Sequence, residues 1–419
     1  MHILIIPSEE FVPEYNHEQG IFQYHQARIL QAAGHRVGAL SISQSFSIPM
    51  LIKAIVYRSV NKNTGNVTDS MSIKQLLGLG YNKIFRPHLF LKPDIVNGIT
   101  VYRINGFYFL APSDINKKYG WVKAGLLAYK EYCCQYGKPD LIHAHNAIYA
   151  GMLSNEIKKI YKIPYLVTEH SSVFARNLIA GKKMEKWVAE TYRNSDGNYA
   201  VSLAFCELLK QRYKTQFNYL PNVLDPYLEE MAFIPKKRNN TAEFIFLNLA
   251  GLNSNKNHKL LIDAFFEAKR DNINAKLWIA GGGELYNEIK NYIHIKGLEN
   301  NVLLLGPLTR ENVTDVIQRS DCMVLSSNYE TFGVVLIESM LFGKPVIATK
   351  CGGPESSVNN SVGLLVDKED AHQLSVAMLK MMAQYDDYDN SRIREYVIRE
   401  FGSKAFLNRV ATIYNKEIA

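Results

Sequence analysis

The chain has 419 residues, of which 47% are hydrophobic and 21% charged, and its formal net charge is +8 at pH 7. This composition is that of a globular protein with room for two domains of about 200 residues each. It excludes a membrane-spanning protein, because no apolar run reaches the roughly 18 residues of a transmembrane helix. The five cysteines have neither the spacing of metal ligands nor that of a disulfide framework, which favours reduced thiols in the cytosol.

Strands and helices are predicted to alternate from the start of the chain. The apolar residues 2–6 are too short for the core of a signal peptide and predict a first strand. Helical patterns follow at 21–33 and 121–134. Further strands of the first half are predicted at residues 36–40, 100–104, 140–145, 164–168 and 197–201.

The second half repeats this alternation after a polar, proline-containing connection at residues 221–240. Its strands are predicted at residues 243–249, 276–279, 302–305, 322–325, 345–348 and 363–366. An amphipathic helical pattern occupies residues 391–418. Two rounds of strand and helix predict an α/β protein with two doubly wound parallel sheets, whose ligands bind at the carboxyl ends of the strands.

The positive charge is concentrated in the first half. Residues 1–222 carry 26 basic and 15 acidic side chains, whereas residues 223–419 carry 22 and 25. Residues 51–93 mix basic side chains with apolar and aromatic ones, and three interpretations are open. They are a solvated insertion, a surface that meets anionic lipid, and a nucleic-acid surface. No DNA- or RNA-binding motif is present, so we expect no nucleic acid and favour a possible anionic membrane surface over it.

Residues 328–338 combine two carboxylates with a helix start. Glu330 follows the strand at 322–325, and Glu338 lies about one turn inside the next predicted helix, below Val334 and Val335. Phe332 and Gly333 open that helix, so the backbone amides of Gly333, Val334 and Val335 form a potential anion site. A glutamate in a first helical turn is often only a partner of the helix dipole. Gly343 and Pro345 complete the pattern here.

This segment resembles the paired-glutamate motif of the retaining glycosyltransferases of family 4, the group 1 glycosyltransferases, which have a GT-B fold. The resemblance covers most of residues 1–20, 140–230 and 245–370. It implies two Rossmann-like domains that face each other across a cleft. We expect an acceptor-side domain at 1–225, a nucleotide-sugar domain at 226–392, and a C-terminal helix at 393–419 that packs back on the first domain.

The resemblance also implies site residues. Glu330 would hold hydroxyls of the donor sugar, and Glu338 would hold the ribose. His170, which follows the strand at 164–168, matches the histidine near the transferred sugar, although such a histidine is also often structural. Lys256 matches the lysine that meets the diphosphate, where an ammonium stabilises the leaving group.

Two glycine positions qualify the match. Gly20 occupies the family's glycine loop, where a second glycine is usual, and would let backbone amides approach the distal phosphate. Gly251 stands where many members have an arginine, so Asn253, Ser254 or a first-domain residue would have to compensate. The histidines at 143 and 145 are expected to be structural, because no third ligand accompanies them.

The implied function is transfer of a hexosyl or N-acetylhexosaminyl group, with retention and without metal or cofactor. The donor would be a UDP- or GDP-sugar, and the acceptor a hydroxyl of a glycan or lipid-linked acceptor in cell-surface polysaccharide biosynthesis. The protein would be cytoplasmic, with a peripheral membrane position as an option. Two alternatives stay open: another GT-B enzyme such as a nucleotide-sugar epimerase, and a catalytically silent sugar-nucleotide-binding module.

Overall fold

The structure is a computed structural model. The residues that it describes are 1–13, 20–47, 52, 74–75, 78, 81–82, 90–108, 114–179, 181–233, 235, 243–271 and 274–418. The membrane or acceptor surface predicted at 51–93 therefore lies almost entirely outside the described residues, as does Gln19 beside Gly20.

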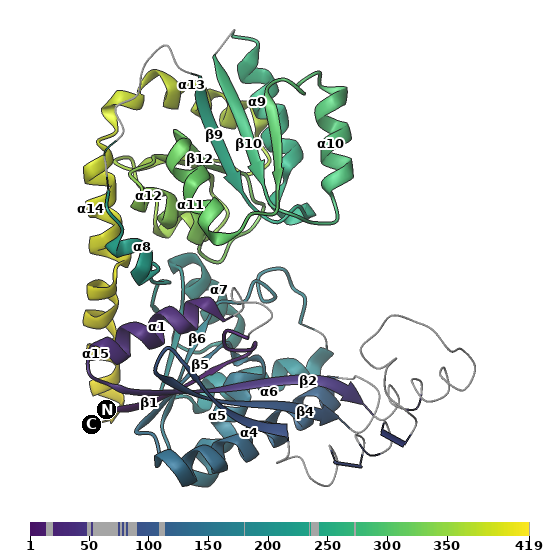
Figure 1. Ribbon diagram of the computed structural model, residues 1–419, viewed down its shortest axis with the longest axis vertical. Coiled ribbons are helices and arrows are strands. Elements are labelled where there is room, and N and C mark those ends of the chain that lie inside the picture. Colours follow the sequence, from purple (N-terminus) through teal and green to yellow (C-terminus); the bar gives the residue numbers. More distant parts are fainter. Residues whose placement is uncertain are drawn as a thin grey trace.

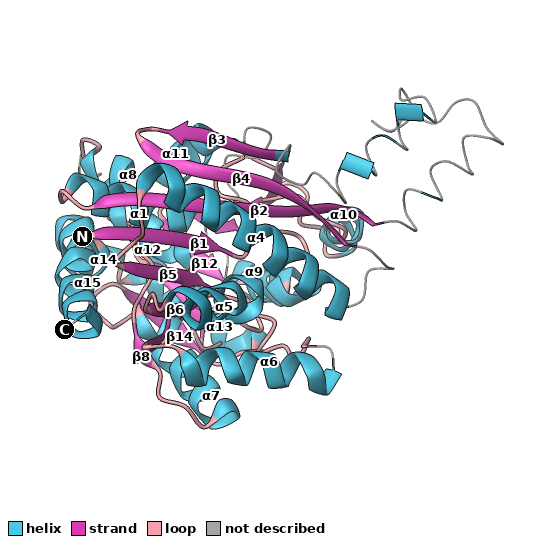
Figure 2. Ribbon diagram, turned by 90° about the horizontal axis from the view of Figure 1, so that it is seen from below, coloured by secondary structure: helices cyan, strands magenta, loops and turns pink. Residues whose placement is uncertain are grey.

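The first domain is built on an eight-stranded sheet in the described part of the chain, in the order β3-β4-β2-β1-β5-β6-β7-β8. Only the β3–β4 pair is antiparallel. Figure 2 shows these strands succeeding one another in one twisted sheet. Their bounds are β1 His2–Pro7, β2 Arg36–Ser47, β3 Leu91–Val96, β4 Ile99–Tyr108, β5 Leu141–His145, β6 Tyr165–Glu169, β7 Gly197–Ala200 and β8 Asn218–Tyr219.

Helices cover both faces of this sheet. Successive side chains of a strand point to opposite faces, so each strand supplies apolar residues to both. On β1, Leu4 and Ile6 belong to the apolar cluster with the residues of α4 and α5, whereas Ile3 and Ile5 pack with those of α1 and α15. Both faces of the strand are thus buried, as expected for a parallel sheet. The helices of the first domain are α1 Ile21–Ala32, α4 Asp114–Tyr136, α5 Met152–Tyr161, α6 Gly181–Asn194 and α7 Leu203–Tyr213, with a π-helical turn at Ala147–Gly151.

In its described residues the second domain contains a six-stranded parallel sheet in the order β11-β10-β9-β12-β13-β14. Counted from its first strand this is the order 3-2-1-4-5-6 of doubly wound dinucleotide-binding folds. The strands are β9 Phe244–Leu249, β10 Ala275–Ala280, β11 Val302–Gly306, β12 Cys322–Leu325, β13 Val346–Thr349 and β14 Gly363–Val366. The helices are α8 Pro226–Glu230, α9 His258–Lys269, α10 Tyr286–Ile295, α11 Arg310–Arg319, α12 Val334–Leu341 and α13 Ala371–Ala383.

Two C-terminal helices, α14 (Asn390–Phe401) and α15 (Ser403–Ile418), run along one side of both domains (Figure 1). Phe401 of α14 meets Phe332 beside α12, with ring centroids 5.6 Å apart, so α14 packs on the second domain. Buried Phe406, Val410 and Tyr414 of α15 join the apolar cluster of the first domain. The chain therefore crosses between the domains a second time at its end.

The structure agrees with the predicted fold class: an α/β protein with two Rossmann-like parallel-sheet domains. The single helix predicted at 391–418 is divided into two at Gly402. The carboxylate of Glu229 caps the second helix: it accepts hydrogen bonds from the backbone amide of Ser403 at 2.9 Å and from the Ser403 hydroxyl at 2.7 Å. Among the described residues, none of the helices has the length and apolarity needed to cross a membrane.

Candidate functional site

The loops that follow β9 and β12 meet at the switch point of the second sheet. These two strands are neighbours, and the strand order reverses between them, which is where ligands bind in such sheets. The backbone amide of Asn328 donates to the carbonyl of Asn255 at 2.7 Å, and the side chain of Asn255 donates to the carbonyl of Tyr329 at 2.9 Å. The two loops are thus held together by hydrogen bonds.

Lys256 and Glu330 form an ion pair across these loops. Nζ of Lys256 lies 2.5 Å from Oε1 of Glu330, which also accepts a hydrogen bond from the Ser327 hydroxyl at 2.7 Å. The side chains are 25% and 13% exposed, respectively, so both can reach a ligand. The amide of Glu330 donates to the carbonyl of Cys351 after β13. Two strand-end loops therefore hold the carboxylate of Glu330, and a third holds its backbone.

The helix start predicted beside Glu330 is present as α12. Gly333 precedes the helix with φ of +89°, a conformation that glycine adopts readily, and no side chain caps the helix. The first amides of α12 therefore carry the partial positive charge of a helix N-terminus. Val334 and Val335 are half-buried in the first turn, and Glu338 lies one turn further on, also half-buried.

The side chain of Phe332 is more deeply buried than those of Val334, Val335 and Glu338. It is 1% exposed and packs against Phe401 of α14, so it belongs to the core. Contact of this residue with a donor would have to come from its backbone. The donor-binding roles of residues 332–335 and Glu338 stay predictions.

The loop after β9 brings Asn253 next to Lys256. The Asn253 side-chain oxygen accepts from the backbone of Asn255 at 3.1 Å and caps the 3-10 turn Ser254–Lys256. Gly251 lies in the same loop and is exposed; a Cβ built there meets nothing closer than 3.6 Å. By contrast, a Cβ on Gly281 would lie 2.0 Å from the carbonyl oxygen of Ala250, so the glycine turn after β10 is needed for the close approach of the two loops.

The predicted histidine of the first domain, His170, follows β6 and is half-buried. Its backbone amide donates to the Asn146 side chain at 2.9 Å, and its Nε2 lies 3.0 Å from Nδ1 of His145. Burial lowers the pKa of the His170 imidazole to about 4, although Asn222 opposes this decrease. The ring is therefore neutral at physiological pH.

The neighbouring carboxyl of Glu169 fixes the loop that carries His170. Glu169 is fully buried and accepts hydrogen bonds from the Ala147 amide at 2.9 Å, the Ser171 amide at 3.1 Å and the Tyr192 hydroxyl at 2.7 Å. Burial raises its pKa to about 7, although these hydrogen bonds oppose the increase. Glu169 is therefore part of the scaffold of the loop.

Gly20 precedes α1 with φ of +70°, and a Cβ there would lie 2.6 Å from the carbonyl oxygen of Glu10. Burial raises the pKa of the neighbouring Glu9 carboxyl, and the backbone of Gly20 opposes this increase. The packing requirement explains the glycine, and its donor-binding role stays a prediction.

The crossover between the domains carries a further charged contact that the sequence did not indicate. Asp225 caps α8 and pairs with Arg310 at the start of α11, while His25 of α1 lies 3.5 Å away from it. Asp225 therefore links both domains at the crossover. Sequence reasoning also missed Ser327, Asn146 and Asn222, which it treated as turn residues or left unassigned.

The predicted site residues thus form two groups. Lys256, Glu330 and Asn253 lie together in the second domain beside α12, whereas the described contacts of His170 and Gly20 lie in the first domain and the crossover. Among the described residues, no group of three His, Cys, Asp or Glu side chains is arranged to hold a metal ion.

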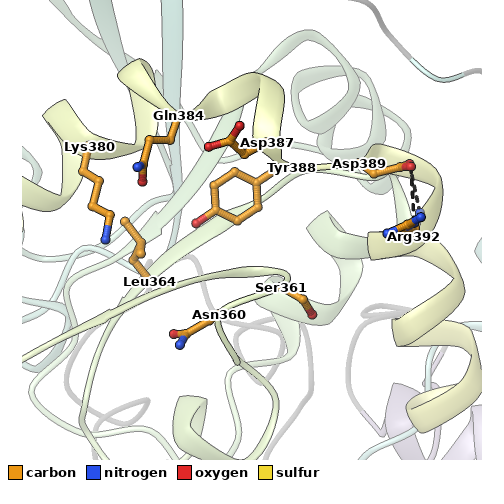
Figure 3. A pocket seen from close by; sticks show the side chains of 9 residues that line it. All are labelled: Asn360, Ser361, Leu364, Lys380, Gln384, Asp387, Tyr388, Asp389 and Arg392. Carbon is orange, nitrogen blue, oxygen red and sulfur yellow. Dashed lines mark hydrogen bonds and ion pairs between the residues drawn. The ribbon is translucent and has the colours of Figure 1, made fainter.

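A pocket of about 400 Å³ lies elsewhere on the second domain, between β14, the end of α13 and the start of α14 (Figure 3). Tyr388 lies at its centre, and Asp389 pairs with Arg392 at one end. None of the predicted site residues lines it.

Two family profiles match consecutive parts of this chain. The profile of the glycosyltransferase family 4 matches residues 20–226, and that of the glycosyl transferases group 1 matches residues 230–398. A similar sequence is an uncharacterized glycosyltransferase from Methanocaldococcus jannaschii, 29% identical over 253 residues. That match covers 58% of this chain and 65% of the relative, so the chain spans just under two thirds of its length.

Solved structures are similar along nearly the whole chain. Sucrose-phosphate synthase from Thermosynechococcus elongatus gives a TM-score of 0.69 at 17% identity and covers 99% of both chains. The Anabaena protein HepE, solved in complex with UDP, gives 0.67 at 17% identity and covers 99% of this chain and 100% of its own. These likenesses establish the GT-B fold. The two profile matches, which together span residues 20–226 and 230–398, show that the chain belongs to the group 1 glycosyltransferases.

Proposed function

We propose that this protein is a retaining glycosyltransferase that moves a hexosyl or N-acetylhexosaminyl group from a nucleotide-diphosphate sugar to a hydroxyl of a glycan or lipid-linked acceptor. The observation that carries the proposal is the Lys256–Glu330 pair beside the uncapped N-terminus of α12, at the switch point of the second sheet. A cation and uncapped helix amides suit a diphosphate, and a largely buried carboxylate that is still 13% exposed suits sugar hydroxyls.

In this proposal the residues act by positioning and by charge. The bond between the anomeric carbon and the diphosphate oxygen breaks, the acceptor oxygen bonds to the same face of that carbon, and the acceptor proton passes to the departing diphosphate. Lys256 has three N–H groups and uses one on Glu330, so the others are available to the leaving group. Glu330 orients the sugar, Glu338 the ribose, and His170 the region of the reacting centre.

The donor is proposed to be a UDP- or GDP-sugar, with UDP supported by its presence in the structure of HepE. A thermal-shift screen of the full chain against UDP- and GDP-sugars, ADP-glucose and the free nucleotides, in the presence of EDTA, tests this. A ligand that binds only the native state raises the free energy of unfolding and with it the unfolding midpoint. At a ligand concentration of 100 times the Kd, the free energy of unfolding rises by about 2.7 kcal/mol. A midpoint unchanged by every nucleotide would contradict the proposal.

The same screen, followed by product analysis, separates the alternatives. A transferase releases product only when an acceptor is present, whereas an epimerase converts the donor alone. We propose metal independence because Lys256 supplies the positive charge at the diphosphate, and full activity in EDTA is the expected result.

Gly251 offers a test of donor affinity. Because a side chain at this position meets no close atom, Gly251→Arg should fold normally and place a guanidinium in the loop that carries Lys256. A charge-assisted hydrogen bond to the diphosphate would then tighten nucleotide binding about tenfold. Isothermal titration with the preferred nucleotide measures this, with Gly251→Gln as the uncharged control. Equal affinities of the two variants would mean that the diphosphate lies away from residue 251.

The proposed setting is cell-surface polysaccharide biosynthesis in the cytoplasm, with a peripheral position on an anionic membrane. Within the described residues, the exposed side chains of Lys182, Lys183 and Lys186 on α6 support a basic surface on the first domain. Cosedimentation with anionic but not neutral vesicles tests this placement, and equal binding to both would argue against an electrostatic contribution.

A further inference from the structure

The pocket of about 400 Å³ on the second domain lies away from the candidate donor site. The loops that carry Lys256 and Glu330 follow the carboxyl ends of β9 and β12. One wall of the pocket is made by Asn360 and Ser361, which precede β14 and so lie at its amino end, and another by the last residues of α13. Because the strands described for this sheet are parallel, their carboxyl ends share one edge and their amino ends the opposite edge. A ligand in the pocket therefore leaves the candidate donor site open.

Side chains that can form hydrogen bonds surround this pocket without using them inside the protein. Among the described residues, Asn360, Lys380 and Gln384 make no hydrogen bond or ion pair through their side chains. All three are exposed, and Figure 3 shows the ends of Lys380 and Gln384 directed from α13 into the space that faces Asn360. An ammonium supplies donors, and a side-chain amide supplies both donors and an acceptor. These groups are therefore available to a ligand with several hydroxyls.

The ring of Tyr388 provides a fixed apolar surface in the middle of the pocket (Figure 3). Tyr388 is half-buried and packs against both apolar clusters that extend into the second domain. Its backbone amide donates to the carbonyl of Tyr385 at 3.1 Å, in the turn between α13 and α14. Leu364 of β14 lines the pocket on the side of the Tyr388 hydroxyl. The pocket thus combines an aromatic ring held by the core with polar groups around it.

The charges around the pocket balance one another. Lys380 and Arg392 are opposed by Asp387 and Asp389, and Nε of Arg392 lies 3.6 Å from Oδ2 of Asp389. A lining with equal numbers of both signs gives little net attraction to a phosphate, a carboxylate or a cation. The face of an aromatic ring is partly negative, so it attracts the weakly positive C–H groups of a pyranose. A neutral sugar is the ligand chemistry that matches both the ring and the polar groups.

We propose that this pocket binds a neutral glycan: a pyranose unit packs against Tyr388, and its hydroxyls form hydrogen bonds with Lys380, Gln384 and Asn360. The volume of the pocket lies within the roughly 300–1,000 Å³ of ligand sites in proteins. Binding at this place is independent of the proposed function. One consequence rests on that function: a glycan acceptor held at the amino end of the second sheet remains associated with the enzyme between transfers.

Saturation-transfer-difference NMR of the full chain with maltotetraose, cellotetraose, mannotetraose and chitotetraose tests the pocket without any turnover. At least one of these neutral oligosaccharides should receive saturation from the protein. Tyr388→Phe keeps the ring and should retain the affinity within about threefold, whereas Tyr388→Leu should weaken it about tenfold, the contribution of one aromatic contact. Gln384→Ala changes an exposed side chain without disturbing the core and should weaken binding as well. Tyr227→Leu is the matched control, because Tyr227 is an exposed tyrosine outside the pocket and its loss should change nothing.

Glu330→Gln separates the pocket from the candidate donor site. Saturation that persists in this variant and falls in both Tyr388→Leu and Gln384→Ala is the expected result. Saturation that is lost in Glu330→Gln but kept in the two pocket variants would place the oligosaccharide at the candidate donor site and overturn the proposal. Saturation of the anionic probe tetragalacturonate without that of any neutral oligosaccharide would also overturn it, as would the absence of saturation from the whole panel.

Discussion

Replacing Lys256 by methionine is expected to reduce kcat by about 100- to 1,000-fold, the usual cost of removing a group that stabilises charge in the transition state. The side chain is 25% exposed and makes one ion pair, so its loss should change the unfolding midpoint little. Glu330→Gln should be similarly impaired, because the amide keeps the shape but not the charge of the carboxylate. Steady-state kinetics with the preferred donor, together with thermal unfolding, measure both effects.

The double variant Lys256→Met/Glu330→Gln separates a catalytic role from a structural one. A merely structural ion pair would let activity recover when both charges are removed together, because no charge is left unpaired. Groups that act on the substrate give no recovery, and we expect the double variant to be as impaired as the worse single variant. Lys259→Met is the matched control, since Lys259 lies three residues away in an exposed pair with Glu288 and should leave kcat unchanged.

Acid is expected to destabilise the protein strongly below pH 6.5. Burial lowers the pKa of His25, His170 and His258 to about 4 and that of His143 to about 3, and it places the pKa of His145 well below its usual value. Between these values and 6.5 the unfolded chain binds protons that the folded chain does not, so stability falls as pH falls. Glu169 acts in the opposite sense between pH 7 and 4.5, because its pKa is raised in the fold.

Each of these groups changes the free energy of unfolding by about 1.4 kcal/mol per pH unit. With the four histidines whose pKa is about 3 or 4 and one opposing carboxyl, the loss at pH 5.5 is on the order of 4 kcal/mol, a large part of the stability of an ordinary domain. Unfolding midpoints measured by calorimetry from pH 7.5 to 5.0 should therefore fall steeply. A midpoint that stays constant over this range would show that these rings accept protons in the folded state.

His258 provides the matched test of this linkage. Both of its ring nitrogens are buried without a partner among the described residues, so His258→Phe removes a proton-binding site without breaking a hydrogen bond. In this variant the loss of unfolding free energy at pH 5.5 should be smaller by about 1.4 kcal/mol, the contribution of one histidine.

The strands at the centre of each sheet could be predicted from the sequence because buried parallel strands are short apolar runs. The edge strand β3 was missed. Its polar residues Lys92, Pro93 and Asp94 are typical of loops, and proline is tolerated in a strand only at an edge or a bulge. The two-residue strand β8 is too short to give any pattern.

The site was partly predictable for a similar reason. Lys256 and Glu330 each follow a predicted strand within a recognisable motif, so their proximity followed from the fold. Ser327 and Asn222 carry no such signal, because serine and asparagine at strand ends usually make turns. Their contacts depend on segments far apart in the chain, and only the folded structure brings these together.

The packing of α15 has a consequence for the synthesis of the protein. Ile3 and Ile5 of the first strand share their apolar cluster with Phe406, Val410 and Tyr414 of the last helix. Ribosomes add about 5–20 residues per second, so the start of the chain emerges on the order of half a minute before its end. The domain that is translated first is thus the one that is completed last. Until α15 has been synthesised, the apolar residues that it covers on one face of the first sheet stay exposed beside α1. A chain without α15 would therefore be destabilised in its first domain.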